Sequence, residues 1–586
     1  MRIKHFFGLA VLAAMTASCS SNNDLVVGGG NGSGENESGA SYASFSINLP
    51  TTSGTRAAGD PEFKPGEANE YDVNDVTLLV FKKPTSATTE GAYTFVESVD
   101  LGSMAPWKNP NETGVTTHSK ITAKLNKVNT TEQFYALVLL NNGKDANAKV
   151  TLPNDGTTTT YSAWNKADNA NYTNFKDTKK GFYMANAPLF DNTKKQVTTL
   201  VAIDKDKIYP TESQASAGAA AADIYVERGL AKVTLNTTTG AATGAATTVA
   251  DGTYKGDKVT IKNWALDVTN KKTFPIHNVD GLSTDYEDIW KNQATQSGAS
   301  TQRFVDNNGS TKAKRVYWGI DPNYKNTKLN AETKQGNTDR EAEFNYVAKD
   351  KLTAELGTPL YCLENTFNLD NMMQGQTTRV IFKAKYTPNG FTENANFYKI
   401  GKNVQLWKQD DLEKHIKAAV TNVVTSATDA NTTITLAGKG NDLTKAGNRM
   451  LTTSNITVKT ATGDVVTLQA ADVKAINDKL GLSEGNGIST YESGDSYYIA
   501  RIKHFGDNLT PWEAGNSYGT NNLAYLGRYG MLRNNWYELK VQSVSGPGYP
   551  DVPKVKPNTP DDENDKYISV SVNILSWAKR SQDVNL

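Results

Sequence analysis

Cysteine is nearly absent from this chain of 586 residues, which contains only Cys19 and Cys362. Because Cys19 closes an N-terminal targeting segment and is expected to carry lipid, no internal disulfide is predicted, and packed cores must stabilise the protein. Histidine is also scarce, and the five histidines show no spacing typical of metal ligands. The sequence therefore predicts neither a disulfide framework nor a metal site.

The chain also has no excess of charge and no recognisable catalytic motif. Lys plus Arg and Asp plus Glu both number 62, which gives no support for nucleic-acid binding or for polybasic attachment to a membrane. A P-loop, a dinucleotide-binding fingerprint and a nucleophile elbow are all missing. We therefore expect neither an enzyme nor a cofactor.

The apolar run at residues 6–15 is too short to span a bilayer, which needs about 20 apolar residues. Arg2 and Lys4 precede this run, and small residues lead from it to Cys19. The order resembles a bacterial lipoprotein signal, so we expect residues 1–18 to be a signal peptide and Cys19 to carry the lipid (palmitate). A plain signal peptide followed by an incidental cysteine is the alternative.

The remaining composition favours a β-rich protein of two or more domains. Tyr, Thr and Val are frequent in short segments that predict strands. These segments are residues 76–81, 134–140, 182–184, 196–203, 224–235, 258–268, 358–364, 378–386, 497–503 and 536–544. We place one domain of short strands at residues 57–223 and a second at residues 224–545.

Helical patterns are few. Residues 410–424 and 470–480 have apolar side chains at helical spacing, which predicts a small helical insertion in the second domain. The low-complexity segment at residues 213–223 is either a linker or a short helix.

An alternating strand is predicted at each end of the chain. At the N-terminal end, apolar and polar residues alternate with a period of two, as do those near the C-terminus. The apolar positions are Ala43, Phe45, Ile47 and Leu49 in the first strand and Ile568, Val570, Val572 and Ile574 in the last, with Trp577 close behind. Both strands are attached by segments that do not pack: Ser/Gly/Thr-rich around Arg56, and proline-rich at residues 546–566.

These two strands predict a strand-exchange mechanism. If both fit one groove in the first domain, the N-terminal strand closes it in an intact subunit, and the C-terminal strand of a neighbour fills it after cleavage. Arg56 is the only arginine between Arg2 and Arg228, and it lies in an exposed-looking segment, so we predict cleavage between Arg56 and Ala57. Chance together with a general preference for lysine is the alternative explanation of that distribution. Residues 19–56 would then be a lipidated prosegment, and residues 546–586 a spacer and donor strand.

Two further residue types have structural interpretations. Cys362 lies in a predicted strand, where a small buried side chain is expected rather than a reactive thiol. The nine tryptophans could line a glycan-binding face, although the strand contexts of Trp264, Trp536 and Trp577 are more typical of core positions.

Several of these segments together resemble the Bacteroidales fimbrillins, the subunits of type V pili, and most closely the major shaft subunit of Mfa-type minor fimbriae. The resemblance is carried by the lipoprotein signal ending at Cys19, the strand followed by TRAAGD around Arg56, and VTLLVF, FYALVLLNNG and VERGLAKV in the first half. RNNWYELKV and the closing VSVNILSWAKRSQDVNL carry it near the end. The residues between 410 and 480 need not match any one relative.

The resemblance implies an all-β fold of two tandem transthyretin-like β-sandwich domains, with the helical insertion in the second and a C-terminal donor strand. It implies a shaft subunit of a cell-surface fimbria, exported across the outer membrane as a lipoprotein precursor and supporting adhesion and biofilm formation. The implied partners are further copies of the chain, tip and anchor subunits, an Arg-specific or trypsin-like protease, and host or bacterial surface ligands. The alternatives are a tip or anchor subunit, or a surface glycan-binding lipoprotein.

Overall fold

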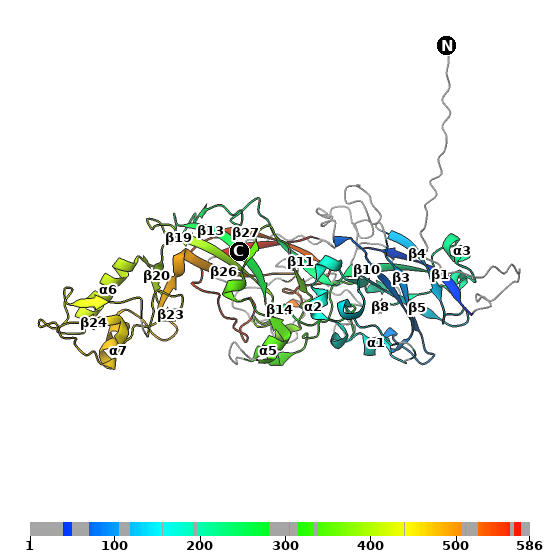
Figure 1. The fold of residues 1–586 in the computed structure, drawn as a ribbon, viewed down its shortest axis with the longest axis horizontal. Helices are drawn as coiled ribbons and strands as arrows, with labels where there is room; N and C mark the ends of the chain where they lie inside the picture. Colours follow the sequence, from blue (N-terminus) through cyan, green and yellow to red (C-terminus); the bar gives the residue numbers. More distant parts are fainter. Residues whose placement is uncertain are drawn as a thin grey trace, which may run out of the picture.

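The computed structural model describes residues 39–49, 70–104, 118–154, 156, 158–191, 196–280, 304, 314–331, 338–438, 440–505, 510, 525–562 and 568–575. Most of the regular structure in this part of the chain is β-strand, arranged in several sheets with few and mostly short helices. The molecule is elongated, with three packed regions one after another along its longest axis (Figure 1). The predicted all-β, sandwich-like fold is confirmed.

The first region, which we call the first sandwich, contains an eight-stranded sheet in the order β3-β2-β5-β6-β10-β1-β4, with β9 paired to β5. Its strands are β1 (Ser41–Asn48), β2 (Val76–Lys82), β3 (Thr94–Gly102), β4 (His118–Leu125), β5 (Phe134–Leu140), β6 (Met184–Asn186), β9 (Val201–Ala202) and β10 (Ala222–Arg228). β2 and β5 were predicted almost residue for residue, whereas the segment 182–184 becomes a strand two residues later than predicted.

The first sheet curls until its two end strands, β3 and β4, lie close together. Glu97 of β3 is buried and accepts hydrogen bonds from the backbone amides of Asn126 and Lys127, immediately after β4. These bonds satisfy backbone donors that would otherwise be left without partners where the chain leaves the strand. The curled sheet encloses one apolar cluster that contains side chains from β1, β2, β4, β5, β6 and β10.

The outer face of the same sheet is buried as well. Leu79 and Phe81 of β2 and Leu137 and Leu139 of β5 pack into a second cluster with aromatic residues from two one-turn helices. These helices are α1 (Tyr161–Trp164) and α2 (Tyr172–Phe175). Burial on both faces explains why β5 reads as a continuous apolar run in the sequence.

The second region, the second sandwich, has two sheets packed face to face. One has the order β18-β11-β27-β28 and the other β12-β13-β19-β26, with β17 paired to β13. The strands are β11 (Leu230–Leu235), β12 (Thr247–Thr248), β13 (Lys258–Asp267), β17 (Ala354–Glu355), β18 (Leu360–Leu363), β19 (Arg379–Thr387), β26 (Asp495–Arg501), β27 (Trp536–Val544) and β28 (Ile568–Leu575).

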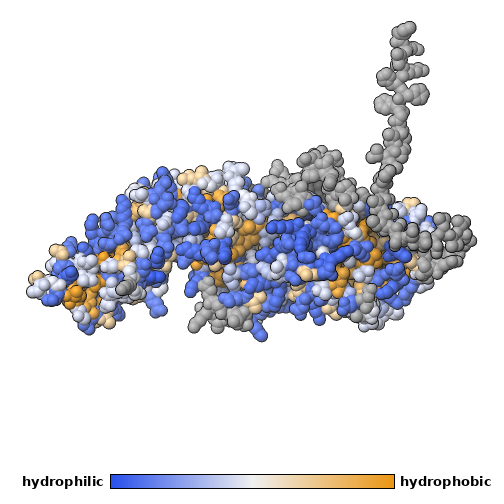
Figure 2. Space-filling model, in the orientation of Figure 1, coloured by the Kyte–Doolittle hydropathy of each residue, from blue (hydrophilic) through white to orange (hydrophobic). Residues whose placement is uncertain are grey.

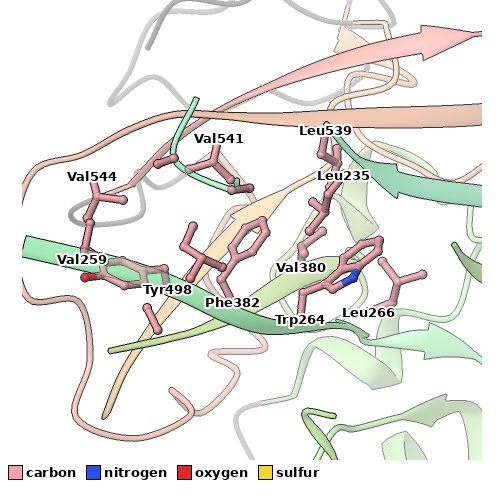
Figure 3. Packing of buried hydrophobic residues seen from close by; sticks show 14 of the residues in the cluster. Leu235, Val259, Trp264, Leu266, Val380, Phe382, Tyr498, Leu539, Val541 and Val544 are labelled. Atoms are coloured by element: carbon pink, nitrogen blue, oxygen red, sulfur yellow. The ribbon is translucent and has the colours of Figure 1, made fainter. Parts of the chain in front are cut away.

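Alternate side chains from the two sheets meet between them to form the core (Figure 3). Leu235 and Leu539 come from one sheet, and Trp264, Val380 and Phe382 from the other. Trp264 is fully buried, which confirms its predicted core position, and its ring nitrogen donates to the carbonyl of Glu355 at 3.0 Å.

The third region, the insertion module, lies between β19 and β26, which are paired neighbours in one sheet. It contains β20 (Phe397–Ile400), β21 (Leu406–Trp407), α6 (Gln409–Thr421), β22 (Thr432–Ile434), β23 (Asn448–Arg449), β24 (Ile456–Val458), α7 (Ala470–Lys479) and β25 (Ile488–Tyr491). Both predicted helices are confirmed, each ending within three residues of the prediction. The module also has its own small sheets and its own apolar cluster, so it is a mixed α/β unit rather than a helical one.

The remaining short strands form two small sheets, and β7 with β15 joins the first region of the chain to the second. β7 (Leu189–Asp191) pairs with both β8 (Gln196–Thr198) and β15 (Lys314–Arg315), and β14 (Thr269–Asn270) pairs with β16 (Phe344–Asn345). The outer cluster of the first sandwich includes Leu230, Leu363 and Trp536 from the second. Apolar side chains of the two sandwiches therefore pack together in one cluster.

Polar side chains cover most of the face seen in Figure 2, and apolar residues form several separate patches among them. Among the described residues, only Tyr225, Val404 and Val465 are large apolar side chains with substantial exposure. A helix long and apolar enough to cross a membrane was not found in the described part of the chain.

Candidate functional site

The candidate site is the position of β1, the first strand that the structure describes. β1 lies in the interior of the first sheet, parallel to β10 on one side and antiparallel to β4 on the other. Phe45 to Asn48 pair with residues of β10, and all eight residues of β1 pair with β4. Removal of β1 would therefore expose two strand edges and leave a slot one strand wide.

The apolar face of β1 is completely enclosed. Ala43, Phe45 and Ile47 have no exposed surface, and Leu49 is 2% exposed. All of them belong to the cluster inside the first sandwich, together with Ile224 of β10 and other side chains. The structure thus places the four predicted apolar residues of the removable strand side by side in one core.

The opposite face of β1 is less exposed than its serine and asparagine residues suggested. The alternation predicted a half-buried strand, but Ser44 has no exposed surface. Its hydroxyl group is within hydrogen-bond distance of the carbonyl of Ala215 and lies 3.0 Å from the Thr122 hydroxyl of β4. Ser44 is buried because the short helix α3 (Glu212–Ala217) lies over this face of the strand.

We call residues 209–221, which include α3, the α3 clasp. Two backbone hydrogen bonds of 2.8 Å join Tyr42 and Tyr209, and the amide of Ala221 donates to the Ser44 carbonyl at 2.7 Å. Lys120 of β4 donates from Nζ to the carbonyl of Ser216 at 2.6 Å. The clasp therefore spans β1 and is fastened to its neighbour β4 on the far side.

The glycine in the α3 clasp has a packing role. A Cβ atom at Gly218 would lie 2.6 Å from the Tyr209 hydroxyl, so only glycine lets the tyrosine ring pack against the clasp. The sequence left residues 213–223 open as either a linker or a short helix, and the structure shows the helix. The clasp was missed as part of the site because alternation identifies strands but says nothing about what covers them.

The far end of β1 is also recognised by side chains. Asn48 donates from Nδ2 to the carboxylate of Asp223 and to the carbonyl of Ile224 at 3.2 Å. At the other end, the buried Ser41 donates to the carbonyl of Val128 at 3.1 Å. Polar contacts therefore fix the position of β1 along the slot, in addition to the backbone ladders.

Residues downstream of the predicted cleavage site are held at the junction between the sandwiches. Glu70 is fully buried, and its carboxylate lies 2.6 Å from Nζ of Lys232 on β11. Arg228 donates from Nε and Nη2 to the Glu70 carbonyl at 3.1 and 3.0 Å, and the Tyr361 hydroxyl donates to the Glu70 carboxylate at 2.7 Å. The chain is thus anchored at Glu70 by contacts that do not involve β1.

The C-terminal strand does not lie in the first sheet. β28 pairs antiparallel with β27 of the same chain, from Val544 opposite Ile568 to Trp536 opposite Leu575. It is the last strand in its sheet order, so it has one paired neighbour. The structure therefore does not bring the predicted donor positions Ile568, Val570, Val572 and Ile574 together with β1 within one chain. Cys19, Arg56, Ala57 and Trp577 lie outside the described residues.

Burial raises the pKa of two ionisable groups, Cys362 in the second sandwich and Glu90 in the first. Burial raises the pKa of the Cys362 thiol to about 12, which fits the predicted inert core position. Burial also raises the pKa of the Glu90 carboxyl to about 7, although that group accepts hydrogen bonds from the amides of Thr199 and Leu200. Within the described ranges, no cluster of three or more potential metal ligands occurs.

The described tryptophans do not form a binding face. Trp164, Trp264, Trp318 and Trp536 are buried, as predicted for Trp264 and Trp536. Trp407 is partly exposed, and its ring stacks on His415 at a centroid distance of 4.6 Å. These five residues therefore give no support to the glycan-binding alternative.

Of the comparisons with known proteins, the match to one family model is informative. A point mutant of the major pilin from Streptococcus pyogenes has a crystal structure that shares 7% sequence identity, covers 63% of this chain and 90% of the pilin, and has a TM-score of 0.12, too low to carry an argument. The comparison with curated proteins found no match. Residues 489–583, which include β26, β27 and β28, match the family described as the major fimbrial subunit protein type IV, fimbrillin, C-terminal. This match supports a fimbrial subunit of the fimbrillin kind, a structural protein of surface fimbriae that assembles with other fimbrial subunits.

Proposed function

We propose that this protein is the shaft subunit of a cell-surface fimbria, and that it polymerises when the C-terminal strand of one copy replaces β1 of another. The observation that carries the proposal is the position of β1. It is the N-terminal strand of the described chain, and it fills an internal place in a sheet whose other strands all follow it in sequence. A single cut between β1 and Glu70 would free it without breaking any other strand connection.

An empty slot would not be stable in water. Loss of β1 would uncover an apolar interior and leave unpaired backbone groups on β10 and β4, which is a template for strand addition. The tail strand has the same alternation of apolar and polar residues as β1. A second copy of the chain can therefore fill the slot with main-chain hydrogen bonds and four apolar side chains.

The processing steps belong to the same proposal. The chain is exported as a precursor lipidated on Cys19, and an Arg-specific or trypsin-like protease cuts after Arg56 at the outer surface. The prosegment then leaves with its strand, and Ala57 becomes the mature N-terminus. Copies of the subunit join one another and the tip and anchor subunits, and the resulting fimbria mediates adhesion and biofilm formation through surface ligands.

The test compares Arg56→Ala with the wild-type chain in cells that secrete and process the protein. Mass spectrometry of the wild-type surface form should give an N-terminus at Ala57, and electron microscopy should show filaments. Arg56→Ala should keep the lipid on Cys19 and remain monomeric, whereas the control Lys64→Ala should assemble normally. Filaments built from Arg56→Ala would refute the cleavage step, and a wild-type surface form that begins at Cys19 would favour a surface lipoprotein.

A further inference from the structure

The tail strand matches β1 on its polar face as well as on its apolar face. Residues 43–49 read ASFSINL and residues 568–574 read ISVSVNI, so the two segments align without a gap. The three polar positions are identical and in the same order: Ser44 with Ser569, Ser46 with Ser571, and Asn48 with Asn573. Apolar alternation alone does not require this identity, because any small polar residue suits an outward position.

Two of these three polar residues make specific contacts in β1. Ser44 lies under the α3 clasp, against the carbonyl of Ala215 and the hydroxyl of Thr122. Asn48 binds the carboxylate of Asp223 and a backbone carbonyl of β10. The partners of Ser44 and Asn48 occupy two fixed positions along the slot, four residues apart. A strand in another register would place different residues at these positions.

We propose that Ser569 and Asn573 of a second copy take over the contacts of Ser44 and Asn48, and that these contacts set the register of the incoming strand. This inference rests on the proposed function and specifies how the slot recognises its occupant. The incoming strand runs in the same direction as β1, parallel to β10 and antiparallel to β4. Ser569 lies under the α3 clasp opposite Thr122, and Asn573 reaches Asp223.

The apolar side chains fit this register by volume. Ile568 is larger than Ala43, while Val570 is smaller than Phe45, and these two neighbouring positions on one face nearly compensate each other. Ile574 is an isomer of Leu49. Cores tolerate such exchanges when the total volume is kept.

A shift of two residues toward the tail's N-terminal side would keep the faces but place the wrong side chains in the slot. Lys566 would enter the buried position of Ala43, and Tyr567 would enter the buried position of Ser44 beneath the clasp. Burial of an unpaired charge is strongly unfavourable, and the clasp leaves Ser44 no exposed surface.

A shift of two residues in the other direction is also disfavoured. Leu575 would take the place of Asn48 and could not donate to Asp223 or to the backbone carbonyl of Ile224. A shift of one residue would turn the apolar face of the tail toward the clasp. The proposed register is therefore the one in which both faces of the tail find matching partners.

The test is disulfide trapping in filaments sheared from cells that produce the full-length precursor. The pair Ser569→Cys and Thr122→Cys should form a disulfide between copies, because the Ser44 and Thr122 side-chain oxygens lie 3.0 Å apart in the equivalent pair. Non-reducing electrophoresis should then show a ladder of covalent oligomers that a reductant collapses to monomer. The control Ser571→Cys with Thr122→Cys should give no ladder. The native Cys362 is buried and does not interfere.

A second pair tests the same register two residues further along the strand. Ser571→Cys with Lys120→Cys occupies the β1 pairing of Ser46 with Lys120, where both side chains reach the surface. Filaments that show a ladder in the control pair, or in neither of the two predicted pairs, would overturn the register and leave strand exchange standing. Filaments from a chain that ends at Lys566 would instead overturn the proposed function itself.

Discussion

β1 and β28 have the same alternating pattern but opposite positions in their sheets. β1 is paired along both edges, with β10 and β4, whereas β28 has β27 as its one paired neighbour. β1 also has the α3 clasp over one face and the core of the first sandwich under the other. β1 is thus held by hydrogen bonds along both edges, whereas β28 is held by hydrogen bonds along one edge.

This difference would give the proposed strand exchange a direction. A tail that moves from β27 to the slot of another copy exchanges one hydrogen-bonded edge for two, and each additional backbone hydrogen bond contributes about 1 kcal/mol net. An intact β1 makes the same contacts without any cost of association, because it belongs to the same chain. Exchange is therefore expected only after the covalent link between β1 and the rest of the chain is cut.

The largest expected effect comes from removal of the tail. A chain that ends at Lys566 should form no filaments at all, since the slot of the next copy has nothing to receive. Its precursor should still fold, because β28 is the end strand of its sheet and β27 is its one described pairing partner. Electron microscopy and circular dichroism measure the two results.

The matched control for this deletion lacks only residues 579–586 and keeps the strand together with Trp577. It should assemble into filaments. Loss of folding in the chain that ends at Lys566 would contradict the comparison, because it would mean that β28 is as essential to the monomer as β1.

The next largest effect is a loss of stability that should occur in the precursor but not in the assembled protein. Phe45→Ala removes a fully buried ring from the core of the first sandwich, so it should lower the free energy of unfolding of the precursor by about 3–5 kcal/mol. Urea unfolding of the uncleaved Arg56→Ala background measures this loss. The control Ser46→Ala, at a half-exposed position on the same strand, should change the stability little.

After cleavage, filaments from Phe45→Ala and wild-type precursors should be identical in resistance to urea, because β1 has left. A lasting difference between the two kinds of filament would show that β1 stays in the assembled subunit and would break the exchange model.

Sequence reasoning identified many strands of the two sandwiches from local signals, but it missed β3 and β4 of the first sandwich. β5 is apolar on both faces and β1 alternates strictly, and the structure contains both strands within a residue or two of the prediction. The buried state of Cys362 and Trp264 followed from their strand contexts in the same way. The predicted strand at residues 224–235 is two strands, β10 and β11, which lie in different sheets. The short strand β6 is shifted because three residues carry little periodic signal.

The rest of the site depends on contacts between residues far apart in the chain. The burial of Ser44 comes from Ala215, 171 positions away, and the anchoring of Glu70 comes from Lys232 and Arg228. The insertion module was predicted as helical because its strands, two to four residues long, are too brief for alternation to show. The pairing of β28 with β27 could not be predicted because an alternating strand fits any complementary edge.

The smallest expected effect tests whether polar contacts favour β1 over β28. Asn48→Ala removes hydrogen bonds to Asp223 and Ile224, so the precursor should lose about 1 kcal/mol of stability in urea unfolding. Asn573→Ala should destabilise the precursor less than Asn48→Ala, because β28 is paired along one edge whereas β1 is paired along both. In filaments the order should reverse: Asn573→Ala lowers the urea concentration at which subunits separate, and Asn48→Ala does not. Equal effects of the two substitutions in the precursor would mean that the slot does not distinguish its occupants by their polar face.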